Sequence, residues 1–183
     1  MNSAFPRLIM LGNLPLICAI LLLSGCQTSR SPVSDRLPSL GHRNWVCVVD
    51  AAYPDQIAPG VVTLATGLDH THLLRTVLAD IASQNHVKPV VVIDRELDAV
   101  AESDAPGINA FRHELPGLLG KLPVERKPHE DIIHDLDRAG NLVRVVILKS
   151  TGVLPYSSVF LRLECGYWTA DAENRLRQSL AKP

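Results

Sequence analysis

Histidine, aspartate and tyrosine side chains stand at the ends of predicted strands and helices, where they could bind and react with a polar ligand. His42 lies just before the apolar run 45–49, and Asp50 directly follows that run. His129 begins a predicted helix, and Tyr156 lies just before the last predicted strand. Histidine exchanges protons near neutrality, with an ordinary pKa of ~6.5. Because α/β sheets bind ligands at the ends of their elements, these four residues are the first candidates for a site.

The elements that must position these residues are visible as apolar runs and helical periodicity. The runs Trp45–Val49 and Pro89–Ile93 are nearly continuous and are typical of strands buried on both faces. Further strands are predicted at 61–65, 124–126, 142–148 and 159–163. Helices are predicted from His70 with Asp69 as the cap, from Ile108 as far as Pro116 and Gly117, from Pro128 to about Ala139, and from Thr169 onward. Strands that alternate with helices in this way predict an α/β fold with a sheet covered on both faces.

The first residues predict export and lipid attachment. Arg7 is followed by an apolar run, 8–23, that is interrupted by Gly and Pro and suits a signal peptide. The run ends in Leu23-Ser24-Gly25-Cys26, which resembles the bacterial lipobox. We therefore expect cleavage before Cys26, lipid on that cysteine as a durable anchor, and a place in the cell envelope. Gln27 follows the cysteine, and this favours the outer membrane, with the domain facing the periplasm.

The expected organisation follows from this leader. Residues 1–25 are the signal peptide, 26–36 the lipidated cysteine with a polar, flexible tether, 37–168 the folded domain, and 169–183 a helical extension. The chain carries 18 Lys and Arg and 19 Asp and Glu, and the leader contains one Arg and no acid, so the mature net charge is −2. A net charge of −2 is not the strongly basic charge that is typical of nucleic-acid-binding domains. Cys47 and Cys165 could pair in an oxidising compartment, although two buried thiols are favoured.

Several short motifs, in this order, resemble the RbsD/FucU family of ribose pyranases and fucose mutarotases. The first is Leu40-Gly41-His42, then an apolar strand, then Asp50-Ala51 with Pro54. Later come His129-Glu130 at a helix start, Pro155-Tyr156, and a final strand that ends in Gly166. The resemblance spans about Leu37 to Trp168. It implies a three-layer αβα fold with an RbsD-like sheet covered by helices on both faces.

The resemblance also implies an activity, which is the opening and reclosure of a free monosaccharide ring without a cofactor. Ring opening takes a proton from the anomeric hydroxyl and delivers one to the ring oxygen, which suits a histidine. When the roles of the family's motif residues are transferred to the matching positions of this sequence, the resemblance implies that His42 is the general acid/base. The residues expected to bind the sugar are Asp50, His129, Tyr156 and Ser158.

The chain departs from the family pattern at several places. Ser158 stands where the family commonly has Asn, and a hydroxyl offers fewer hydrogen bonds than an amide. Gly152-Val153 replaces the usual Gly-Glu turn. The segment after His129 is longer than usual, so His134 is a weaker alternative for the same role.

His42 and Asp50 cannot serve one site within one chain. They are eight residues apart, which corresponds to about 26 Å at roughly 3.3 Å per residue of extended strand. If both act on the sugar, the site must be shared between neighbouring subunits. We therefore expect a homo-oligomer, as the resemblance also implies.

Other functions fit the sequence less well or remain as alternatives. A non-catalytic monosaccharide-binding lipoprotein is the second hypothesis, and a structural envelope lipoprotein the third. Metal ligation is disfavoured, because His70 with His72 and His129 with His134 have the wrong spacing to share a helix face. No Cys-x-x-Cys, His-Glu-x-x-His or nucleophile elbow occurs.

Overall fold

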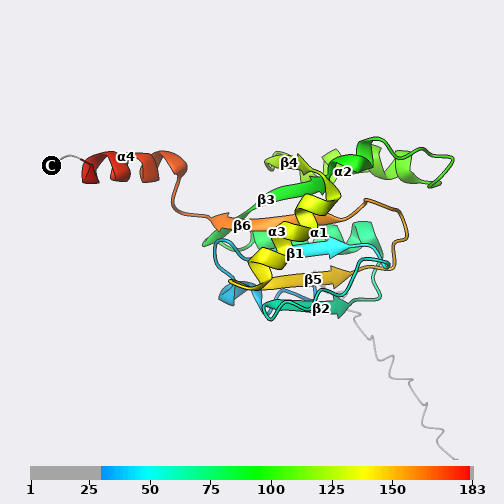
Figure 1. The fold of residues 1–183 in the computed structure, drawn as a ribbon, viewed down its shortest axis with the longest axis horizontal. Coiled ribbons are helices and arrows are strands. Elements are labelled where there is room, and N and C mark those ends of the chain that lie inside the picture. Colours follow the sequence, from blue (N-terminus) through cyan, green and yellow to red (C-terminus); the bar gives the residue numbers. More distant parts are fainter. Residues whose placement is uncertain (1–29, 182–183) are drawn as a thin grey trace, which may run out of the picture.

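The computed structural model describes residues 30–181, which form one mixed sheet of six strands with helices around it (Figure 1). The strands lie in the order β2-β5-β1-β6-β3-β4. They are β1 (Trp45–Val49), β2 (Val61–Ala65), β3 (Val87–Asp94), β4 (Val124–Lys127), β5 (Val145–Lys149) and β6 (Val159–Cys165). β6 is antiparallel to both of its neighbours, and all other pairs are parallel. The carboxyl ends of five strands therefore meet at one edge of the sheet, beside the amino end of β6.

Helices cover both faces of this sheet (Figure 1). They are α1 (His70–Ala82), α2 (Ile108–Leu119) and α3 (His129–Gly140), with short 3₁₀ turns at Leu37–Ser39 and Arg95–Asp98. The helix α4 (Ala170–Leu180) projects away from the sheet and has no buried residue. Val46 and Val48 of β1 pack in the core with α1 and α2, whereas Trp45, Cys47 and Val49 pack in a second core with α3. This alternation follows the twofold period of a strand. The prediction of a three-layer α/β fold is confirmed.

The helix starts follow ordinary capping chemistry. Asp69 caps α1, because its side chain accepts the backbone N–H of His72 at 2.9 Å, as predicted. Thr169 caps α4 in the same way through the N–H of Ala172. The sequence predicted Pro128 as the first residue of the third helix, but Pro128 is the cap of α3 and the helix begins one position later, at His129.

Most predicted boundaries differ from the structure by no more than two residues, but two differ by three. The second helix was expected to end at Pro116, but α2 continues through Pro116 to Leu119. Leu115 and Leu119 are both buried in the core, and their burial outweighs the one hydrogen bond that proline cannot donate. The strand β5 begins at Val145 and not at Leu142, because the N–H groups of Leu142 and Val143 bond to the Ala139 carbonyl at the end of α3.

The described chain is already packed at its first residues. The backbone N–H of Ser31 donates to Asp80 of α1 at 2.7 Å, and Val33 is fully buried in the core. Residues 31–36, predicted as part of the tether, therefore belong to the folded domain. The predicted signal peptide and Cys26 lie outside the described residues. Among residues 30–181, no helix has the length and apolar character that crossing a membrane requires.

Cys47 and Cys165 are free thiols in this structure. Cys47 lies in the middle of β1 and is fully buried, and its burial raises the pKa of the thiol far above the ordinary value. Cys165 is the last residue of β6 and is partly exposed.

Candidate functional site

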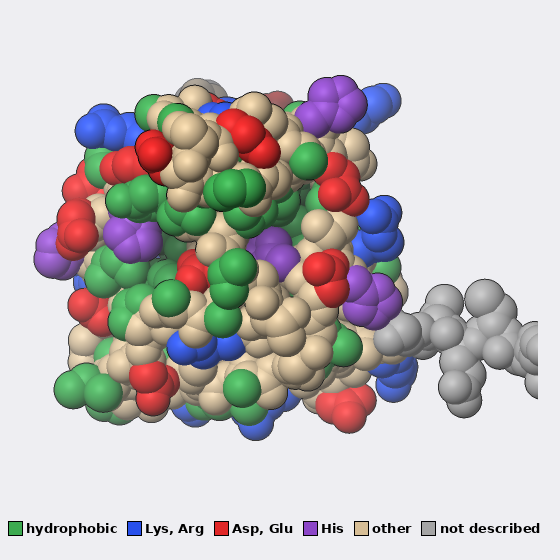
Figure 2. All heavy atoms as spheres, turned by 90° about the vertical axis from the view of Figure 1, so that its right-hand side faces the viewer, with side chains coloured by type: hydrophobic (Ala, Val, Ile, Leu, Met, Phe, Trp, Pro, Cys, Tyr) green, Lys and Arg blue, Asp and Glu red, His purple; other side chains and the backbone are tan. Residues whose placement is uncertain are grey.

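Most of the predicted site residues gather at the carboxyl edge of the sheet. Asp50 directly follows β1, His129 follows β4 at the start of α3, and Tyr156 and Ser158 lie just before β6. Figure 2 faces this edge and shows histidine side chains beside a hollow between hydrophobic ones. The parallel strands β1 and β4 carry Asp50 and His129 to this edge, because parallel strands end on the same side of a sheet. Tyr156 and Ser158 reach the same edge because β6 is antiparallel and begins there.

Asp50 and Ser158 are joined by a hydrogen bond between two central strands. The Ser158 hydroxyl donates to Asp50 Oδ2 at 3.2 Å, and Asp50 Oδ1 accepts the backbone N–H of Ala52 at 2.8 Å. Ser158 is buried, whereas Asp50 is partly exposed. Ser158 therefore orients the carboxylate and has little capacity left for a ligand of its own.

His129 pairs with a residue that the sequence did not single out. Its Nδ1 lies 3.0 Å from Oδ1 of Asp94, the last residue of β3. Asp94 is fully buried, and its Oδ2 has no hydrogen-bond partner among the described residues. Burial raises the pKa of Asp94, and the hydrogen bond to His129 opposes that rise. A histidine whose Nδ1 is held by a buried carboxylate has a defined ring orientation and keeps Nε2 for other contacts.

The backbone of His129 is held as well. Its N–H donates to both oxygens of Glu96, at 3.1 and 3.2 Å. Glu96 thereby replaces the side-chain cap that Pro128 cannot offer and places a negative charge at the amino end of α3. Asp94 is the last residue of β3, and Glu96 lies two residues later. The end of this one strand therefore holds both the side chain and the main chain of His129.

Tyr156 stands over His129 in a strained backbone conformation. Its φ is 55°, a left-handed value that a bulky residue rarely adopts. The two rings meet edge to face, with centroids 5.5 Å apart and an angle of 85° between their planes. The exposed Tyr156 ring thus becomes a wall of the site beside the imidazole.

A second histidine, His70, holds the loop that carries Tyr156. Its Nε2 lies 2.9 Å from the Ser157 carbonyl, which can only accept, so Nε2 carries the proton. Nδ1 lies 2.9 Å from the Ser150 hydroxyl, which donates to the Val49 carbonyl at 2.9 Å and accepts the N–H of Gly152 at 3.1 Å. Burial lowers the pKa of His70, and its hydrogen bond to the Ser157 carbonyl opposes that fall. His70 is therefore a structural residue behind the site.

His42 lies at the opposite edge of the sheet. It precedes β1, so the whole strand separates it from Asp50. It lines a cavity of 760 Å³ together with Lys88, Glu164, Tyr167, Trp168 and Glu173. The structure thus brings together Asp50, His129, Tyr156 and Ser158 within one chain and leaves His42 apart from them.

The remaining alternatives find less support in the geometry. His134 is exposed on α3, and its side chain makes no hydrogen bond within residues 30–181. No cluster of three or more His, Cys, Asp or Glu side chains suited to a metal ion occurs in that range. A signal for Asp94 was present in the sequence, because it ends a buried apolar strand just as Asp50 does.

Comparisons with known proteins support the fold. No family model matches the chain. No curated protein matches it. Among solved structures, it is similar to RbsD of Bacillus subtilis in complex with D-ribose, with a TM-score of 0.51 and 17% identity over 72% of this chain and 90% of that one. It is also similar to the fucose mutarotase of Streptococcus pneumoniae in complex with L-fucose, with a TM-score of 0.51 and 17% identity over 75% and 94% of the two chains. At this identity the similarity establishes a common fold.

Proposed function

We propose that this protein interconverts the ring forms of a free monosaccharide by acid/base catalysis at the carboxyl edge of its sheet. The observation that carries the proposal is the Asp94–His129 pair beside the bonded Asp50 and Ser158. The similar structures hold D-ribose and L-fucose, which are neutral sugars of the size that such an edge could take.

Ring opening needs two proton transfers. A base removes the proton of the anomeric hydroxyl, the bond between the anomeric carbon and the ring oxygen breaks, and an acid protonates that oxygen. Reclosure reverses both transfers on either face of the carbonyl. His129 Nε2 suits one transfer, because Asp94 holds the other ring nitrogen and stabilises the imidazolium that forms. Asp50 would accept hydrogen bonds from sugar hydroxyls, and Tyr156 would offer its ring to the sugar's apolar side.

We assign the second transfer to His42 of a neighbouring copy. Within one chain, β1 keeps His42 away from the carboxyl edge, so only another subunit can bring a His42 to it. This requires a homo-oligomer with sites at subunit contacts. A strictly monomeric chain that is fully active would contradict the assignment.

Saturation-transfer NMR tests the activity. The chain expressed from Gln27 is added to equilibrated ribose, fucose or glucose, and exchange between the ring forms is recorded. We expect faster exchange that is lost in His42→Ala and His129→Ala and kept in His113→Ala, which changes an exposed histidine of α2. Exchange that is no faster than in buffer would reject catalysis.

The second candidate function is sugar binding without turnover. The cavity around His42 favours it, because Tyr167 and Trp168 present 77% and 45% of their area to solvent there, beside Glu164 and Glu173. Aromatic faces with nearby carboxylates can stack on a sugar and bind its hydroxyls. Sugar-dependent shifts of the Trp168 signals, without faster exchange, would favour this function.

We also propose that the protein is exported and anchored to the outer membrane through lipid on Cys26. The proposal rests on the leader and on the lipobox-like Leu23-Ser24-Gly25-Cys26. Mass spectrometry of the full chain made in a bacterium should find a mature product that begins at a lipid-modified Cys26. The Cys26→Ala chain should lack the lipid. An unmodified mature terminus in the parent chain would reject the anchor.

A further inference from the structure

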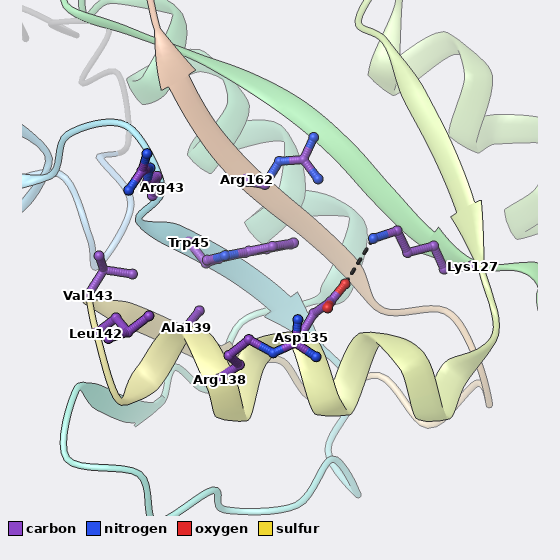
Figure 3. Close-up of a pocket in the computed structure, with 9 residues that line it drawn as sticks. All are labelled: Arg43, Trp45, Lys127, Asp135, Arg138, Ala139, Leu142, Val143 and Arg162. Atoms are coloured by element: carbon purple, nitrogen blue, oxygen red, sulfur yellow. Dashed lines mark hydrogen bonds and ion pairs between the residues drawn. The ribbon is translucent and has the colours of Figure 1, made fainter.

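A groove on the α3 face of the sheet lies away from the carboxyl edge. It has a volume of 380 Å³ and opens beside the start of β1 (Figure 3). The ring of Trp45 lies between α3 and Arg162 of β6, whose guanidinium carbon is 5.8 Å from the ring centroid. Ala139 and the exposed Leu142 continue this apolar surface. The groove therefore has a mainly apolar wall.

Four cationic side chains line the groove, and two of them are neutralised by acids. Lys127 pairs with Asp135 at 2.8 Å. Arg162 holds both oxygens of Glu125, at 2.9 and 3.2 Å, and also bonds Glu164 at 3.0 Å. These pairs hold the side chains of the groove in place and leave little positive charge for a ligand.

The other two cations, Arg43 and Arg138, have no acidic partner among residues 30–181. Arg43 comes from the turn before β1 and Arg138 from the second half of α3, and both line the groove. No ion pair and no hydrogen bond of either guanidinium is found in the described chain. The whole chain has a formal net charge of −1, so this local excess of positive charge does not come from a basic protein.

The backbone at Arg43 is held in an unusual conformation. Its φ is 71°, in the left-handed region that residues other than glycine seldom adopt. Two hydrogen bonds hold the turn: the N–H of Arg43 donates to the Leu163 carbonyl, and the N–H of Gly41 donates to Asn44 Oδ1, both at 2.7 Å. The turn thereby anchors the main chain of Arg43 at the rim of the groove.

We propose that this groove binds a small organic anion, a carboxylate or a phosphate monoester, with Arg43 and Arg138 supplying the positive charge along its rim. Guanidinium groups bind both kinds of anion through paired N–H donors. The body of the ligand would lie against Trp45 and Leu142, and the volume falls within the range of about 300–1,000 Å³ that small-molecule sites have. The anion would use none of Asp50, His129, Tyr156 and Ser158, but Arg43 directly follows His42 and lines the same cavity, so the groove lies next to the residue that the proposed sugar site takes from a neighbouring copy.

Tryptophan fluorescence can follow binding at this groove. The chain has two tryptophans, so Trp168→Phe leaves Trp45 as the only reporter. Glucose 6-phosphate and glucuronate serve as anionic probes of the purified full-length chain, and glucose serves as the neutral control. We expect a saturable change with the two anions, weaker at high salt, and none with glucose. Isothermal titration calorimetry measures the same affinities without relying on Trp45.

Matched arginine variants decide whether the site is specific. Arg43→Gln and Arg138→Gln should each weaken anion binding at least about tenfold, which corresponds to about 1.4 kcal/mol. Arg175→Gln removes the same charge from the exposed α4 and should leave the affinity unchanged. No saturable binding by either method, or an equal loss in Arg175→Gln, would overturn the proposal. Circular dichroism confirms that the variants remain folded.

Discussion

Oδ1 of Asp94 lies 3.0 Å from Nδ1 of His129 at the carboxyl edge of the sheet, and the other oxygen of Asp94 has no partner among the described residues. The two residues come from different elements, the end of β3 and the start of α3. A buried carboxylate with a single hydrogen bond is unfavourable for folding alone. The pair is therefore more readily explained by what it does for His129 than by stability.

The first prediction concerns this pair. Asp94→Asn keeps the shape and removes the charge that orients His129 and stabilises its protonated form. Sugar ring exchange should fall by roughly 10²-fold or more. The proton of the neutral His129 ring should also redistribute between Nδ1 and Nε2, which ¹⁵N NMR reports directly. Because the NMR signature does not depend on catalysis, it tests the orienting role even if no sugar reacts. An unchanged distribution of the proton would reject that role.

The second prediction concerns the shared site. His42→Ala and His129→Ala chains should each be inactive, and mixing them with subunit exchange should restore activity. In a random mixture about a quarter of the sites would combine an intact His42 with an intact His129 from the neighbour. Ring exchange in the mixture, compared with each variant alone, measures this recovery. No recovery, with exchange of subunits demonstrated by mass spectrometry, would show that the two histidines do not share a site.

The third prediction concerns the pH dependence of stability. Burial lowers the pKa of His70 from the ordinary 6.5, so the unfolded chain takes up a proton at this residue before the folded chain does. The free energy of unfolding should therefore fall as the pH drops below ~6.5 and approaches the lower folded pKa. Above ~6.5 His70 should add no pH dependence.

Urea titrations between pH 4.5 and 7.5 measure this effect. His70→Gln should flatten the dependence in that window. His72→Gln, an exposed neighbour on α1, should keep the slope of the parent chain. A slope that His70→Gln does not change would mean that other groups cause the loss of stability.

The fourth prediction concerns the first packed residues. Val33 is fully buried in the core that α1 shares with the sheet, so Val33→Ala should lower the free energy of unfolding by roughly 1–3 kcal/mol. Val153→Ala changes a valine that is 82% exposed and should have little effect. Urea unfolding compares the two. Equal effects would mean that residues 31–36 act as the tether predicted from the sequence.

The sequence by itself determined the elements of this fold. Trp45–Val49, Val61–Ala65 and the start of α1 at Asp69 were predictable, because a buried strand or a capped helix is encoded in neighbouring residues. The separation of His42 from Asp50 was predictable for the same reason, since one strand lies between them. The two boundaries furthest from the prediction, at Pro116 and Leu142, are each three residues off, because tertiary packing and the helix end outweighed local preferences there.

Only the tertiary structure decided which side chains meet. Asp94 and His129 are 35 residues apart in the chain, and Asp50 and Ser158 are 108 apart. No local spacing relates such residues; they meet because β6 is inserted antiparallel between β1 and β3, while the parallel strands all end at one edge. The groove of Arg43 and Arg138 has the same origin, because the turn before β1 reaches α3 only after the sheet has formed.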